Sequence, residues 1–207
     1  MPHAFRLLIV SVAFAGTVGS LRGPILHAHT TNSWAPVVWL SAGFPVVPGS
    51  SSVLRRTTEV ATMHIASSGF APDSVVTAWW VIFNYPLNCA HPVPATNSLC
   101  SGPDIANPAT GATYQWADGQ VVRDEGEIAL KASLAVGDIS SCASASLPCV
   151  GLLDVNGAEY HIALRSMGAV IPSMLALQLT TLDAGCRAGE PNAGQCANVQ
   201  GAVHPGQ

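Results

Sequence analysis

The sequence predicts an all-β fold, specifically an antiparallel β-sandwich of the immunoglobulin-like or superoxide-dismutase-like kind with disulfide-stapled loops. Three observations predict it: short runs of alternating apolar and polar residues, turn residues between these runs, and six cysteines in three sequence-local couples. Alternation with a period of two is typical of strands that bury one face. No long segment has the 3.6-residue period of an amphipathic helix, which favours two packed sheets.

The first pair of predicted strands covers 57–66 and 75–83. Both runs are rich in β-branched and aromatic residues, which favour strands. Gly69, Pro72 and Asp73 lie between them and supply the backbone angles that a turn needs. These residues therefore predict two consecutive strands joined by a short connection.

Further strands are predicted in the second half of the chain. Residues 112–123 form a hairpin candidate, because Asp118 and Gly119 suit a tight turn with positive backbone angles. Residues 171–181 could form a short helix or a strand, and we favour the strand. Alternation or strand-rich composition predicts the other strands, at 126–138, 158–168 and 196–205.

The N-terminal end predicts an export signal in residues 1–20. Arg6 precedes an apolar run from Leu7 to Ala15, and small residues suited to a signal peptidase follow. No later stretch reaches the ~20 apolar residues of a membrane-spanning helix. We expect a secreted or periplasmic protein, with an irregular arm over 21–52 and one β-sandwich domain over 53–207.

The even number of cysteines in an exported chain predicts three disulfides. The spacings within the couples are short, so pairing inside each couple is favoured, although six cysteines allow 15 connectivities. A zinc site is a weaker alternative, because no Cys-x2-Cys spacing occurs. The predicted pairs are Cys89 with Cys100, Cys142 with Cys149, and Cys186 with Cys196.

Composition limits the classes of partner. Only 10% of the residues are charged and the formal net charge is −4. Lys131 is the one lysine, and there is no basic block. Nucleic acid and anionic membrane surfaces are therefore not expected as partners.

Several stretches resemble a family of uncharacterised secreted bacterial proteins. They are "AWWVIFNYPLNC", "DGQVVRDEGEIALKASLAVGD", "GLLDVNGAEYHIALRSMG", and "DAGC" followed by "CANVQGAVH". The resemblance covers roughly residues 53–205 and implies a shared fold and export, with little indication of chemistry.

A second stretch, "MHIASSGFAPDSVVTAWWVIFN", is similar to a strand, turn and strand of the copper/zinc superoxide dismutases and of the chordin-type repeat. In the dismutases the second strand carries a His-x-His pair that binds copper. Trp79, Trp80 and Val81 occupy the equivalent place here. The similarity therefore implies the architecture alone, without dismutase activity.

A histidine-based copper or zinc site is the sharpest chemical hypothesis. His64, His161 and His204 fall on separate predicted strands, and His91 falls in the first cysteine loop. Imidazoles that converge across a sheet can bind either metal. Two residues, Glu159 and Arg165, share a strand face with His161, so the carboxylate could orient the imidazole. The alternative is that these histidines are separate polar positions on the sheet.

Other candidate sites carry weaker patterns. His27 and His29 could form an N-terminal metal clip, although a solvated tail is favoured. The acidic stretch 123–127 is typical of a solvated turn rather than a glycosidase pair. No Gly-x-Ser-x-Gly motif occurs, and paired cysteines would leave no thiolate nucleophile. These patterns favour a non-catalytic protein over an enzyme.

Trp79 and Trp80 are adjacent in a predicted strand, so their side chains must point to opposite faces. They cannot form one aromatic platform, and a central strand buried on both faces is the favoured interpretation. Two function classes remain. One is a non-catalytic exported protein whose loops bind a protein partner, a surface polymer or a small ligand. The other is a copper or zinc metalloprotein with a redox or storage role.

Overall fold

The computed structural model describes residues 30–144 and 146–207. The predicted export signal and the pair His27 and His29 lie outside these residues. The strands are Thr31–Trp39 (β1), Val46–Arg56 (β2), Val60–Ser67 (β3), Ser74–Phe83 (β4), Ala112–Val121 (β5), Ile128–Ala135 (β6), Glu159–Ala169 (β7) and Ala197–His204 (β8). One α-helix, Leu175–Thr180 (α1), accompanies short 3-10 helices at Pro86–Asn88, Pro94–Thr96, Gly102–Ala106, Pro108–Thr110 and Pro172–Met174.

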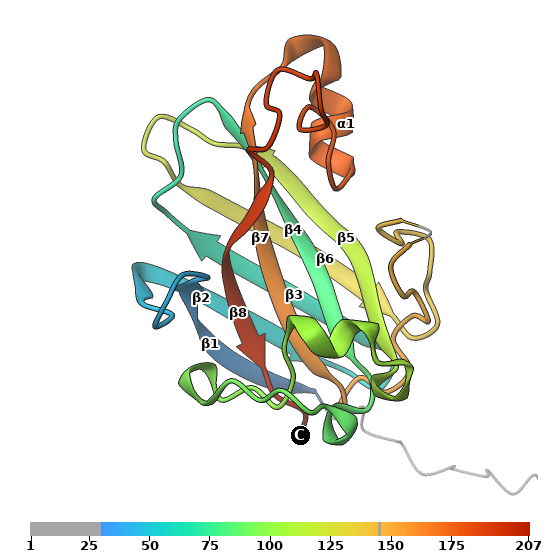
Figure 1. Ribbon diagram of the computed structural model, residues 1–207. Helices are drawn as coiled ribbons and strands as arrows, with labels where there is room; N and C mark the ends of the chain where they lie inside the picture. Colours follow the sequence, from blue (N-terminus) through green and yellow to red (C-terminus); the bar gives the residue numbers. More distant parts are fainter. Residues whose placement is uncertain (1–29, 145) are drawn as a thin grey trace, which may run out of the picture.

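All eight strands belong to one antiparallel sheet, with the order β5-β4-β7-β8-β1-β2-β3-β6. The sheet rolls into a nearly closed barrel (Figure 1). The all-β antiparallel class is thus confirmed, but one continuous sheet replaces the two separate sheets of the predicted sandwich. The connection between the halves is narrow, since β1 and β8 pair only at Val38 with Gly201 and Trp39 with Gln200. Strand patterns alone do not reveal such a short pairing.

Side chains bridge the seam between the two edge strands, β5 and β6. The backbone amide of Lys131 donates to Asp118 Oδ2 at 3.0 Å, and that of Ala129 donates to Gln120 Oε1 at 3.2 Å. The other half of the β5 edge pairs with the cysteine loop that follows β6, where Trp116 N donates to the carbonyl of Ser141 at 2.7 Å. Both edges are therefore protected from pairing with another chain.

The sheet has an apolar core on each side of β4. Trp80 lies inside the barrel and its ring meets Tyr160 edge-on, with 6.1 Å between the ring centroids. Trp79 lies outside the barrel, beneath the loops, and packs against Tyr114. Every residue of β4 is buried. The prediction of a strand that is buried on both faces is confirmed.

The predicted irregular arm over 21–52 is wrong from Thr31 onward. This segment forms β1 and most of β2, which pair with each other and join the sheet. The alternation is irregular because the β1–β2 register shifts between Pro36 and Val38. That irregularity, together with the Pro, Gly and Ser content of the segment, hid both strands.

Two local predictions in the second half are also wrong. Asp118 and Gly119 lie inside the single strand β5, which continues past a register shift opposite Ala78 and Trp79, so no hairpin turn forms there. Residues 171–181 contain a 3-10 turn and α1 in place of the favoured strand. Gly119 is required for close packing: a β-carbon there would lie 2.5 Å from the carbonyl oxygen of Leu179.

Disulfides join the cysteines within each predicted couple, namely Cys89 to Cys100, Cys142 to Cys149 and Cys186 to Cys196. Such bonds persist in oxidising compartments, which agrees with a protein outside the cytoplasm. Across the residues that the structure describes, no helix has the length and apolar character needed to cross a bilayer.

Candidate functional site

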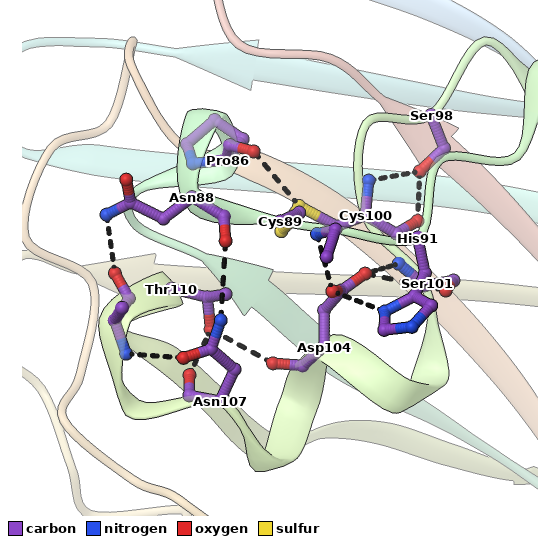
Figure 2. Close-up of polar contacts among 12 residues, drawn as sticks. Pro86, Asn88, Cys89, His91, Ser98, Cys100, Ser101, Asp104, Asn107 and Thr110 are labelled. Carbon is purple, nitrogen blue, oxygen red and sulfur yellow. Dashed lines mark hydrogen bonds and ion pairs between the residues drawn. A yellow bond between two sulfur atoms is a disulfide. The ribbon is translucent and has the colours of Figure 1, made fainter.

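The site lies on the outer face of the barrel, beneath the loop of residues 84–111 that connects β4 to β5 (Figure 1). Buried Asp104 organises this loop from within. Its carboxylate accepts hydrogen bonds from the amides of Ala90 and Ser101, at 2.8 and 2.9 Å, and from His91 Nδ1 at 2.9 Å (Figure 2). Burial alone would raise the pKa of Asp104, but these three donors outweigh it and hold the pKa below its ordinary value.

Glu159, at the start of β7, ties the other end of the loop to the barrel. The amides of Leu99 and Cys100 donate to its carboxylate at 2.9 and 3.0 Å, and the hydroxyl of Ser98 donates at 2.6 Å. His161 Nε2 lies 2.7 Å from Glu159 Oε1. Burial would raise the pKa of Glu159, but the hydrogen bonds from His161, Ser98 and Leu99 lower it overall. The carboxylate is therefore ionised and orients the imidazole.

A cavity of about 240 Å³ lies between this loop and the outer face of the sheet. Its lining is mostly apolar. His161 and Ala163 come from β7, while Tyr114 and Asn198 add polar atoms. The remaining apolar lining comes from the sheet (Val38, Val81, Phe83, Val203), from the loop (Val93, Ile105) and from the β1–β2 connection (Leu40, Phe44). The arrangement suits a small molecule with a large apolar part.

Phe44 lines this cavity in a strained backbone conformation, with φ at 49°. Bulky residues rarely adopt the left-handed region, and the conformation costs on the order of 1–3 kcal/mol. Such strain clusters at ligand-binding positions, where the surrounding structure maintains it. The ring of Phe44 is thereby held at the cavity wall.

His161 supplies an imidazole to the lining of the cavity. Its Nε2 is engaged by Glu159 and lies 3.0 Å from Ser98 Oγ, whereas its Nδ1 has no hydrogen-bond partner among the described residues. The side chain is 20% exposed. In the neutral imidazole whose Nε2–H donates to Glu159, Nδ1 is the acceptor for a donor group on a bound molecule.

The four predicted metal-binding histidines do not converge. His204 is buried inside the barrel, where its two ring nitrogens each lie 2.9 Å from a serine hydroxyl, Ser33 at Nδ1 and Ser52 at Nε2. His64 is exposed on the outer face of β3, and His91 binds Asp104. Within residues 30–144 and 146–207, no group of three His, Cys, Asp or Glu side chains could hold a metal ion. The expected convergence is therefore wrong, because His204 faces the barrel interior while His64, His91 and His161 lie on separate strands or loops outside it.

The two residues predicted to support His161 have different roles. Glu159 makes the expected contact with the imidazole. Arg165, in contrast, donates to the carbonyls of Leu182 and Cys196, at 2.7 and 3.2 Å, and so holds the third cysteine loop.

Other residues of the site were not predicted. Ser101 and Asp104 form a capping box around a 3-10 helix, and their Ser-x-x-Asp spacing is a signal that sequence reasoning could have used. Ser98 and Phe44 carry no comparable signal, because their roles depend on contacts with distant strands.

A second cavity of about 380 Å³ lies elsewhere on the barrel. Its lining includes Trp39, Phe70, Pro72 and Gln195, and none of the described residues that line it is titratable. It therefore lacks the polar anchor that His161 provides in the first cavity.

Comparisons with known proteins found no matching family model, no matching curated protein and no matching solved structure. The resemblances inferred from the sequence therefore stay predictions, and functional inference depends on the site itself.

Proposed function

We propose that this protein is an exported, non-catalytic binding protein that holds a small, largely apolar molecule in the cavity beneath the loop of residues 84–111. The observation that carries the proposal is an apolar cavity with an oriented histidine, His161, whose Nδ1 has no partner among the described residues. The bound molecule would place a hydroxyl or amide donor on Nδ1 and its apolar part against Phe83, Ala163 and Val203.

The dimensions support this class of ligand. An apolar cavity of about 150 Å³ is enough to hold benzene. The cavity here, about 240 Å³, has room for a substituted ring or a short branched chain. At roughly 25 cal/mol per Å² of apolar surface, burial of such a molecule gives several kcal/mol before the cost of association is subtracted.

The cavity wall is held in place before any ligand arrives. Asp104, Glu159 and the Cys89–Cys100 disulfide fix the loop at three points. A preformed wall reduces the entropy lost on binding. The same contacts argue against nucleophilic catalysis, because Ser98 is buried and its hydroxyl holds Glu159.

The test compares 4-ethylphenol with ethylbenzene by titration into the ¹⁵N-labelled protein. Both probes have the same apolar skeleton, and only the phenol can donate to His161 Nδ1. We expect both to shift amides around Ala163 and Val203, with at least five-fold tighter binding of the phenol. His161→Phe should abolish this preference, and Val203→Phe should fill the cavity and abolish both interactions.

Val150→Phe is the matched control, since Val150 is exposed on another loop and does not line the cavity. It should leave both affinities unchanged. Absence of shifts around the cavity with either probe would overturn the proposal, as would equal binding by the Val203→Phe protein.

A further inference from the structure

None of the described residues covers the outer face of the barrel over β1, β2, β3 and β6, unlike the face beneath the loop of residues 84–111. Trp34 on β1 is 74% exposed there. The register places Trp34 beside Val53 on β2, Val53 beside His64 on β3, and His64 beside Lys131 on β6. Their side chains share one face of the sheet, so an aromatic ring, an imidazole and an ammonium group lie along one line across four strands.

Positive charge gathers on this face although the protein is acidic. Arg55, two residues after Val53 on β2, is exposed on the same face. None of the four strands contains an Asp or Glu. Arg55 and Lys131 make no ion pair with any residue that the structure describes. The nearby acids lie at the margins: Glu59 in the β2–β3 turn, exposed Glu127 directly before β6, and Asp118 at the seam with β5.

We propose that this open face binds a carboxylated polysaccharide chain. The ring of Trp34 would stack on the apolar C–H face of one sugar, while Arg55 and Lys131 would pair with the carboxylates of its neighbours. Adjacent strands lie about 4.8 Å apart, so Trp34 and Lys131 are roughly 14 Å apart across the sheet. This span fits an oligosaccharide rather than a single sugar.

The surroundings favour a glycan over an anionic membrane. A membrane-binding face needs a cluster of apolar and basic side chains. Here the row of side chains on one side of Trp34 is polar (Asn32, Arg55, Thr62 and Ser133), and the hydroxyls of Thr62 and Ser133 lie 2.8 Å apart. The row on its other side has small side chains or proline and no large apolar side chain (Pro36, Ser51, Ala66 and Ala129). Hydroxyl and amide groups suit the hydroxyls of a sugar chain, whereas they would be costly to bury among lipid tails.

The test measures binding of an oligogalacturonate to the full-length protein, by calorimetry and by the part of the tryptophan fluorescence change that Trp34→Ala removes. We expect binding that weakens as salt concentration rises, and at least ten-fold weaker binding of a neutral cello-oligosaccharide of the same length. Trp34→Ala, and Arg55→Gln combined with Lys131→Gln, should each reduce the affinity for oligogalacturonate at least ten-fold.

Two matched controls separate this face from the general surface. Leu87→Ala removes another exposed apolar side chain, and Arg123→Gln removes an exposed charge on a different segment. Both should bind like the unaltered protein. The proposal is overturned if oligogalacturonate does not bind or if the controls weaken binding equally. It is also overturned if vesicles with anionic lipids, or a second copy of the chain, occupy the face in a Trp34-dependent manner.

Discussion

The interior of the barrel contains a charged residue without a carboxylate partner among the described residues. Arg56 is fully buried, donates to the Ser33 hydroxyl at 2.8 Å and to the Pro205 carbonyl at 2.7 Å, and lies 5.1 Å from the centroid of the Tyr160 ring. Residues 1–29 contain no Asp or Glu that could neutralise it. The guanidinium therefore depends on hydroxyl, carbonyl and aromatic contacts, which include a cation–π interaction.

This environment keeps His204 neutral. Burial, and then the positive charge of Arg56, lower the pKa of His204 to about 4. One arrangement satisfies both ring nitrogens of a neutral imidazole: the Ser33 hydroxyl donates to Nδ1, and Nε2–H donates to the Ser52 hydroxyl. Protonation would add a second positive charge to a buried cluster that already holds Arg56.

The stability of the protein should therefore fall in acid. The folded pKa of His204 is about 4 and the ordinary value is 6.5, so the unfolded chain binds more protons between these pH values. We expect the free energy of unfolding to decrease as pH falls through this window, with a contribution of roughly 3 kcal/mol from His204. Urea denaturation at a series of pH values measures it.

His204→Gln is the comparison, because glutamine keeps hydrogen-bonding groups and does not titrate. The variant should show a shallower dependence between pH 4 and 6.5. If the free energy of unfolding depends on pH equally in the two proteins, the pKa of His204 is not lowered as predicted.

At the level of single elements, the packing of α1 on β5 depends on Gly119. Trp116 Nε1 donates to the carbonyl of Leu179 at 2.8 Å, and this places the helix backbone directly over the strand. Asp118–Gly119 is a good hairpin signal in isolation. Tertiary contact overrides it, since Gly119 pairs with Thr77 in the β4–β5 ladder and lies against the backbone of α1.

Gly119→Ala should destabilise the protein by about 1–3 kcal/mol, because the new methyl group would press on a backbone carbonyl that cannot move alone. Thermal unfolding measures the change. Gly102→Ala is the control: a β-carbon there meets nothing within 4 Å, and the backbone conformation suits alanine. If both variants have the same melting temperature, α1 does not rest on β5 as described.

For the whole molecule, the important boundary is the seam between β5 and β6. Asp118 and Gln120 cover the β6 amides with their side chains in place of a continuous backbone ladder. Edge strands with free amides recruit other chains, so we expect these two side chains to prevent association as well as to close the barrel.

Replacing both residues, Asp118→Ala with Gln120→Ala, should leave the amides of Ala129 and Lys131 without partners. We expect concentration-dependent dimers or larger species, detected by light scattering after gel filtration. The control is the double variant Glu125→Ala with Gln207→Ala, which removes a carboxylate and an amide side chain at exposed positions. Its molecular mass in solution should equal that of the unaltered protein. Equal association of the two double variants would show that the seam does not control it.

Two parts of the candidate site could be predicted from the sequence, because each depends on contacts that are local in the chain. Glu159 and His161 are two residues apart on one strand, so their side chains share a face and meet without any knowledge of the fold. Cys89 and Cys100 pair across a short loop for a similar reason. Phe44 and Ser98 could not be predicted, because each acts on strands that are distant in sequence.

The sequence by itself determined the β class and the opposite directions of Trp79 and Trp80, and it favoured the disulfide pairing that the structure contains. Each follows from alternation or from spacing over 11 residues or fewer, where contacts depend mainly on local chain geometry. Only the tertiary structure decided that β1 pairs with β8, that a single sheet rolls into a barrel, and that the histidines point to separate places. These outcomes depend on pairing between distant strands, and alternation specifies which face of a strand is buried without specifying its neighbour.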